Sequence, residues 1–421
     1  METTILRDPV QFSSSSLESN MNTGLATSRR FVLVLGLLTS LVAFAIDISL
    51  PAIPPMVRDL ATNMSLGQQV VGFFMVGMAA GQLPSGLISD RIGRMPVLYA
   101  GIVLFTLAGV VTSLTNDINV MLAARFVQGL GASAGMVLAR AIVRDISSGN
   151  QAARLMSIMV MVFTAAPMIA PLLGSYLVTV WGWHTPFAAT TIAGVLILYG
   201  IRSSLRETHT PAPHSHITRR FWQSVIEFSS QRESIFGVMI VMVTIVGIMA
   251  LVSGSSALVI EIYDYPVKYF GYIFALTGVA ILVGSSINRR MLQRFDAIQM
   301  IGVGAGLAAI AGIQLLTMAW LGQASFWWVW GNICLFMCST GFLLPNATAL
   351  ALDPVPEIAG VAASIIGTIQ SLAGASSAVI CSALYTGTIL NVALVVGMSG
   401  LGAAVVFLLR RLILVHHTDQ D

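Results

Sequence analysis

Residues 86–95 read GLISDRIGRM, and residues 284–293 read GSSINRRMLQ. Each copy has a glycine, three further residues, Asp or Asn, and then Arg, and the two copies begin 198 residues apart. Each lies in a loop that follows a long apolar segment. A loop repeated at this spacing predicts two parallel copies of one helical bundle joined in a single chain.

The composition around these loops is that of a membrane protein. Hydrophobic residues make up 56% of the 421 residues, charged residues only 9%, and the mean hydropathy is +0.86. Because a soluble domain carries about 25% charged residues, this chain cannot cover a water-facing surface. The basic residues are spread over many short loops, so the sequence predicts no nucleic-acid partner, and the expected surroundings are a lipid bilayer.

Runs of about 20 mostly apolar residues predict the transmembrane helices. Twelve such runs occur, at approximately 31–53, 68–88, 96–115, 118–140, 155–179, 184–202, 235–258, 267–288, 297–320, 325–350, 358–383 and 388–409. The predicted fold is an all-α membrane protein of twelve helices in two six-helix repeats. We expect a disordered cytoplasmic tail, a first bundle, a cytoplasmic linker, a second bundle and a second cytoplasmic tail at 1–28, 29–202, 203–234, 235–411 and 412–421.

The arginines predict the orientation, because cytoplasmic loops carry an excess of Arg and Lys. With the N-terminus inside, seventeen of these residues fall in cytoplasmic segments, and only Arg58 and Lys268 fall in outer loops. Both termini are therefore expected in the cytoplasm.

The linker between the bundles is polar and contains His209, His214 and His216. A solvated linker fits this pattern better than a metal site, since no cysteine or paired carboxylate joins the histidines. Its second part, ITRRFWQSVIEF (217–228), is amphipathic and could lie along the inner membrane surface.

Three formal charges fall inside the first four spans: Asp47, Arg125 and Arg140. A charge deep in a bilayer is costly, so a chain that keeps one there is expected to use it. Asp47 and Arg125 are both expected in the outer third of the membrane, and we hypothesise that they sense one another directly or through water. The alternative is a fixed ion pair that only joins two helices, although such a pair is a poor route to stability.

A proton path through these spans needs a carboxylate, because all six histidines lie in loops, at span ends or in the tail. Asp47 is the only acid well inside a span. Burial raises the pKa of a carboxyl group and a nearby arginine lowers it, so an acid here is expected to gain and lose a proton as its surroundings change. Glu261, near the outer end of the seventh span, is the second candidate, or else an exposed loop acid.

Four stretches resemble motifs of the major facilitator superfamily, and the resemblance extends from Arg29 to Arg411. GLISDRIGRMPVL (86–98) is similar to the signature between helices two and three, with Met95 where a second basic residue is usual. RFVQGLGASAGMVLARAIVRDI (125–146) resembles the fourth-helix motif, and AAPMIAPLLGSYL (165–177) the fifth-helix pattern of antiporters. AIDISLPAIP (45–54) looks like the first-helix pattern of twelve-helix drug:proton antiporters.

The combination is most like the bicyclomycin-resistance branch, which also shows a stretch similar to YFGYIFAL (269–276). This resemblance implies export of drugs or siderophore-like metabolites in exchange for protons, from a bacterial inner membrane and as a monomer. It also implies a latch that stabilises the outward-open state. The expected latch residues are Gly86, Asp90, Arg91, Gly93, Arg94, Arg144 and Asp145.

Two alternatives stay open for these motifs. At the latch, Asp90 could cap a helix N-terminus or meet a cation such as Arg144, or the arginines could be a solvated loop that only fixes topology. In the fifth span, Pro167, Pro171 and Gly174 could permit a bend and close packing against a helix of the second half, or merely a kink.

A substrate cavity is expected between the halves. Polar residues inside the spans and an adaptable apolar wall are candidates to line it. These candidates are Gln128, Asn332, Asn346, Gln370, Met136, Met168 and Phe336.

The sequence lacks the residues that ATP binding, catalysis, and metal or cofactor binding would need. The single lysine, Lys268, has no phosphate-binding loop around it, which argues against ATP as the energy source. No histidine lies in the membrane for a Ser-His-Asp site, so no catalytic site is predicted. Cys334, Cys338 and Cys381 have neither disulfide nor zinc spacing and are expected to pack as apolar residues, so no metal or cofactor is predicted.

The predicted function is therefore proton-coupled export of small amphipathic compounds by alternating access, with Asp47 as the proton-binding carboxylate. An importer of a metabolite or siderophore on the same fold is the alternative. A receptor or channel without coupled transport is more remote.

Overall fold

The computed structural model describes residues 29–147, 149–209, 217–322 and 325–410, and within these ranges the chain is helical with no strand. The first group of elements contains α2 (Arg29–Asp47), η1 (Leu50–Ala52), α3 (Ile53–Asp59), α4 (Met64–Ile92), α5 (Arg94–Leu114), α6 (Ile118–Ile146), α7 (Gly149–Trp181) and α8 (His184–Ser204). The helix α9 (Ile217–Ser230) follows in the linker. The second group contains α10 (Arg232–Ser256), η2 (Ala257–Ile262), α11 (Val267–Met291), α12 (Ala297–Leu321), α13 (Phe326–Leu352), η3 (Pro356–Ile358), α14 (Ala359–Ala383) and α15 (Leu390–Leu408).

Twelve helices in the described ranges are long and apolar enough to cross a membrane, which confirms the predicted fold class. Local sequence explains several of their starts. Asn63 accepts a hydrogen bond from the backbone of Leu66, Asp117 caps α6, and Asp296 forms a reciprocal capping box with Gln299. These side chains satisfy N–H groups that have no partner inside the helix.

The first span is broken, where a continuous helix over 31–53 was predicted. Helix α2 ends at Asp47, and the chain continues through η1 into the short helix α3. Pro51, Pro54 and Pro55 follow this break, and proline cannot donate a backbone hydrogen bond to the preceding turn. The break places Asp47 at a helix end.

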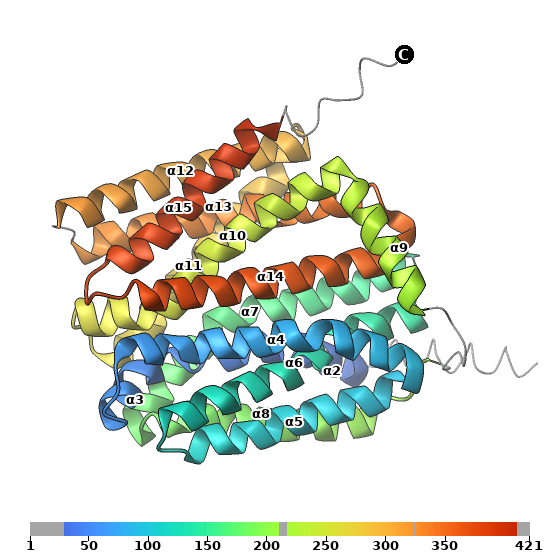
Figure 1. Cartoon of the computed structure of the whole chain (residues 1–421), viewed down its shortest axis with the longest axis horizontal. Coiled ribbons are helices and arrows are strands. Elements are labelled where there is room, and N and C mark those ends of the chain that lie inside the picture. The colour runs from blue at the N-terminus through green and yellow to red at the C-terminus, as the bar shows by residue number, and fades with distance from the viewer. Residues whose placement is uncertain (1–28, 148, 210–216, 323–324, 411–421) are drawn as a thin grey trace, which may run out of the picture.

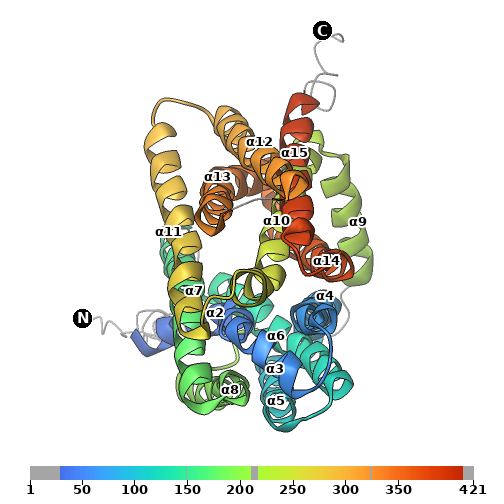
Figure 2. The ribbon, with the colours of Figure 1, turned by 90° about the vertical axis from the view of Figure 1, so that its left-hand side faces the viewer.

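The two groups of helices form two layers (Figure 1), and Figure 2 shows the same layers from the end of the molecule. Across the boundary, α4 packs on α14 and α7 packs on α11. Small residues permit the approach: a Cβ added at Gly72 would lie 3.3 Å from the Cβ of Ala378, and one at Gly271 would lie 2.6 Å from the Cα of Leu172. The boundary is thus a close helix–helix contact of the kind that small residues allow.

The two ends of the molecule differ. We call the end that carries α9 and the 86–95 segment the linker end, and the opposite one the far end. At the far end, Arg58 of α3 forms an ion pair of 3.7 Å with Glu261 of η2, across the boundary. Nearby, the Ser65 hydroxyl donates to the Ser382 carbonyl at 2.8 Å. These contacts hold the two layers together there.

The segment that carries Glu261 is a π-helix over Ala257–Ile262, which the apolar pattern did not predict. A wider turn of this kind changes the direction of the side chains that follow it. Here it brings Glu261 within reach of the Arg58 guanidinium.

The linker helix α9 packs against α10 and α14, with Ser224 and Phe228 buried and Ile226 exposed. Its position along the inner membrane surface stays a prediction. The predicted tails at 1–28 and 412–421 lie outside the described residues, as do His214 and His216.

Candidate transport site

Asp47 is buried inside the first layer, with 5% of its surface exposed. It is the last residue of α2, and the carbonyl oxygen of the next residue, Ile48, lies against Gly174 of α7. Within the described residues, no hydrogen-bond donor contacts the Asp47 carboxylate. Burying a charged carboxylate without a hydrogen-bond donor costs more free energy than burying the neutral carboxyl group.

Arg125 is completely buried in α6 and has no carboxylate partner among the described residues. Its Nη1 donates to the Ala45 carbonyl at 3.3 Å and to the Gln128 side chain at 2.9 Å, and its Nε donates to the Val70 carbonyl at 3.3 Å. Its Nη2 has no partner. The guanidinium also lies over the Phe74 ring, 4.6 Å from the centroid. The two N–H donors of Nη2 are therefore left unused.

Asp47 and Arg125 lie in adjacent parts of the first layer. Arg125 binds the backbone of α2 at Ala45, two residues before Asp47, but no ion pair joins the two side chains. The buried carboxyl group of Asp47 and the buried guanidinium of Arg125 therefore lie near one another in the fold without forming a direct ion pair.

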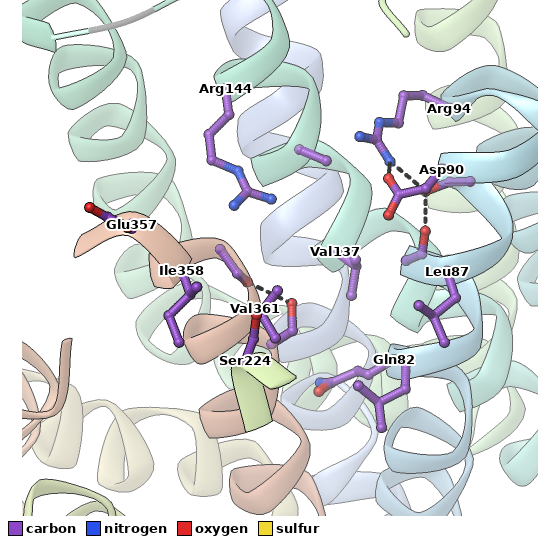
Figure 3. Close-up of a pocket in the computed structure, with 16 residues that line it drawn as sticks. Gln82, Leu87, Asp90, Arg94, Val137, Arg144, Ser224, Glu357, Ile358 and Val361 are labelled. Atoms are coloured by element: carbon purple, nitrogen blue, oxygen red, sulfur yellow. Dashed lines mark hydrogen bonds and ion pairs between the residues drawn. The ribbon is translucent and has the colours of Figure 1, made fainter. Parts of the chain in front are cut away.

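The 86–95 segment forms a compact polar cluster at the linker end (Figure 3). It is not the predicted loop, because residues 86–92 are the last turns of α4, Arg94 begins α5, and only Gly93 lies between the two helices. The second copy differs from the prediction in the same way, since residues 284–291 belong to α11. Arg94 pairs with Asp90 one turn earlier, bonds Asp145 of α6 through Nε at 3.0 Å, and donates to the Ser89 hydroxyl at 2.8 Å. Asp90 therefore meets Arg94 and not Arg144, the cation considered from the sequence. Gly93 turns the chain with a φ of +102°, a conformation that favours glycine.

Glu207 in the linker completes this cluster, which sequence reasoning missed. Its carboxylate accepts hydrogen bonds from the backbone N–H groups of Arg94 and Met95, both at 2.9 Å, at the start of α5. Partial desolvation raises the pKa of Glu207, but these bonds and those from the backbone of Thr208 and His209 outweigh it and hold the pKa below its usual value. In the sequence, this contact was indicated only by the position of Glu207 as an acid directly after Arg206 at the start of the linker.

A cavity of about 370 Å³ lies between the two layers at the linker end. Side chains from α4, α6, α9, η3 and α14 line it, among them Gln82, Arg144, Ser224, Glu357 and Ser364. Figure 3 shows Arg144 reaching into this space from α6, apart from the Asp90–Arg94 pair. Gln82, in the cavity lining, donates to the Ser371 hydroxyl at 2.9 Å across the boundary.

None of the seven residues predicted to line a cavity lines this one. All of them except Gln370 take part in helix packing. Gln128 bonds Arg125 and Thr190, Asn332 bonds its own helix, and Asn346 bonds Asn288. Phe336 is 1% exposed, Met168 packs on Gly278, and Met136 and Gln370 are half-buried.

The fifth span, α7, runs through Pro167 and Pro171 without a break. The Pro171 carbonyl and Leu172 pack on Gly271 of α11, and the Ser175 hydroxyl accepts the Gly271 N–H at 2.9 Å. Gly174 faces the other way, toward Ile48 and Pro51 of the first layer. The proline side of this helix therefore contacts the second layer, and its glycine contacts the chain next to Asp47.

The described residues contain no group of three His, Cys, Asp or Glu side chains that could hold a metal ion. The three cysteines are free thiols in the interior or partly buried.

Comparison with known proteins finds relatives that are named as drug-resistance proteins. The profile of the Major Facilitator Superfamily matches residues 35–378. A bicyclomycin resistance protein homolog of Haemophilus influenzae is 31% identical over 355 residues, which is 82% of this chain and 87% of the relative. Multidrug resistance protein D of Escherichia coli is 29% identical over 342 residues, or 81% of this chain and 85% of the relative.

Solved structures show the same fold. The crystal structure of a D-xylose–proton symporter matches with a TM-score of 0.72 at 17% identity, over 90% of this chain and 96% of that one. A transporter of the POT family matches with a TM-score of 0.74 at 14% identity, over 91% of this chain and 97% of that one. At these identities the likeness concerns the fold alone. The twelve apolar helices and the bacterial relatives indicate a multi-pass protein of the inner membrane.

Proposed function

This chain belongs to the Major Facilitator Superfamily, among relatives of the bicyclomycin- and multidrug-resistance proteins, so it is a transporter and not an enzyme, and we propose that it exports small amphipathic compounds in exchange for protons. The names of these relatives point to drug efflux. Coupling to protons rests on the site described above.

The observation that carries the proposal is the buried Asp47 carboxylate without a hydrogen-bond donor. An ionised carboxylate in that position is expensive, and membrane proteins keep such acids where protons or ions pass. Arg125 nearby supplies a positive charge that favours the ionised form when the two approach. Small changes in this spacing would therefore load and unload a proton.

The proposed cycle uses the two ends of the molecule in turn. We place the linker end in the cytoplasm, because arginine is concentrated in the segments there. The state described here has its far end joined by the Arg58–Glu261 pair and a cavity at the linker end, where a cytoplasmic compound would enter. Opening of the far end would release the compound outside and let a proton reach Asp47. Return to the present state would deliver that proton to the cytoplasm.

Uptake of candidate drugs into everted membrane vesicles, driven by an imposed inside-acid pH gradient, tests this proposal. Wild type is compared with Asp47→Asn at matched expression. Asp264→Asn is the control, because Asp264 is exposed and has a φ of +53°, a conformation that asparagine also adopts. We expect gradient-dependent uptake by wild type and the control, and none by Asp47→Asn.

Equal uptake by Asp47→Asn and wild type would remove Asp47 from the coupling step and turn attention to Glu261. Accumulation that runs in the same direction as the protons would contradict export and favour an importer.

A further inference from the structure

Arg140 and Arg144 lie one turn apart on α6, about 6 Å along the helix axis. Arg144 lines the cavity at the linker end together with Val137 and Ala141. Arg140 does not itself line the cavity, but it is three residues from Val137 and four from Arg144, so helical spacing places it beside the lining face of α6. Both arginines are exposed, although α6 is otherwise largely buried.

Neither guanidinium is neutralised within the described part of the chain. Among the residues that the structure describes, no ion pair or hydrogen bond to a protein group is made by Arg140 or Arg144. The acids of the same region are engaged elsewhere, because Asp90 and Asp145 both bind Arg94. Glu207 accepts backbone N–H groups, and Glu357 on the opposite wall pairs with neither arginine.

An unpaired cation within a membrane span is costly and marks a water-filled pathway or a ligand. Two such cations on one helix face also concentrate anions in a cleft with low-dielectric walls. The guanidinium fork matches a carboxylate or phosphate group with two parallel hydrogen bonds. Arg140 and Arg144 therefore provide donors for an oxyanion that the protein does not itself supply.

We propose that Arg140 and Arg144 bind the anionic group of the transported compound, so that the carrier selects amphipathic anions such as carboxylates. This inference rests on the proposed transport function. Arg144 would meet the anion in the cavity, and Arg140, one turn from Arg144 beside the lining face of α6, would reach the same group with its long side chain. The apolar part of the compound would lie against Leu83, Val137 and Val361, which line the same cavity.

A matched pair of probes tests the charge preference directly. Dansyl-glycine carries a carboxylate at neutral pH, whereas dansyl-glycinamide is neutral and otherwise nearly identical. Binding of each to the purified full chain in non-ionic detergent is measured by fluorescence anisotropy, with empty micelles as the blank. Wild type is expected to bind the anion about tenfold more tightly than the amide, in line with charge-assisted hydrogen bonds.

The variants assign that preference to the two arginines. Arg140→Gln and Arg144→Gln should each bring the ratio of the two affinities close to one, and Arg140→Lys, which keeps the charge without the fork, should retain part of it. Arg202→Gln is the control, because Arg202 is exposed at the end of α8 and away from the cavity lining. Its ratio should equal that of wild type.

A wild-type ratio near one, or an unchanged ratio in Arg140→Gln, would overturn the inference. If Arg140→Gln does not fold, Arg140→Lys takes its place in the test. Full retention of the anion preference by lysine would show that the paired N–H donors of the Arg140 guanidinium do not hold the anion, which would contradict the inference. The result is independent of proton coupling. A preference that survives while everted vesicles show no gradient-driven uptake would refute the proposed function alone, and gradient-driven uptake of neutral drugs that ignores Arg140 would refute this inference alone.

Discussion

Arg125 shows how a single residue can serve transport at the expense of stability. Its side chain is fully buried, and within the part of the chain that the structure describes it has no carboxylate partner and no acceptor for Nη2. Replacing buried charged groups by apolar ones of similar volume is often neutral or stabilising. A purely structural role would therefore be filled as well by an apolar side chain.

We predict that Arg125→Met folds with a melting temperature equal to or above that of wild type but loses at least about tenfold of its gradient-driven uptake. The reason is that methionine fills the space between Phe74 and Phe187 but supplies no charge to the neighbourhood of Asp47. Melting in detergent and uptake into everted vesicles are the two measurements. Wild-type uptake by Arg125→Met would show that the cation only joins helices.

Gly174 controls helix packing, because it sets how closely α7 approaches the break after Asp47. A Cβ there would overlap the Ile48 carbonyl, which is backbone and cannot move aside as a flexible side chain can. We predict that Gly174→Ala destabilises the protein by about 1–3 kcal/mol. Gly306→Ala in α12, where a Cβ meets nothing within 4 Å, should be neutral or slightly stabilising. Equal melting temperatures for the two variants would contradict the close contact.

Glu207 acts on the start of α5, and its effect should depend on pH. Because the folded-state pKa of Glu207 is below its ordinary value of 4.5, its contribution to stability is present above that pH and is lost as the pH falls through the folded pKa. Glu207→Gln should therefore melt at a lower temperature than wild type at pH 7, with the difference shrinking below about pH 4.5.

Melting of both proteins between pH 3.5 and 7 measures this effect. Glu227→Gln is the control, because Glu227 is exposed on α9 and its side chain caps no helix. A difference between Glu207→Gln and wild type that stays constant with pH would show that size or shape, and not ionisation, explains the loss.

At the scale of the whole molecule, the sequence was sufficient for the fold but not for the cavity. A spanning helix needs about 20 apolar residues whatever its neighbours are, so the twelve spans could be predicted from local hydropathy. The chain breaks before Pro51 yet runs through Pro167, because surrounding helices decide whether a proline is tolerated. The positions of Gln128 and Glu207 depend on partners far along the chain, and no local pattern reports such contacts.

The far-end contact should control which end of the molecule is open. Arg58 and Glu261 are partly exposed, so their pair adds little to folding stability, but it exists only while the far ends are together. Ser65→Cys with Ser382→Cys reports that closure in a background where the native cysteines are alanine, since the two hydroxyls lie 3.1 Å apart. Arg58→Glu should slow disulfide formation about two- to fivefold, and adding Glu261→Arg should restore the rate because the pair is remade with its charges exchanged. Failure of the exchanged pair to restore the rate, with both proteins folded, would show that packing alone holds the far end closed.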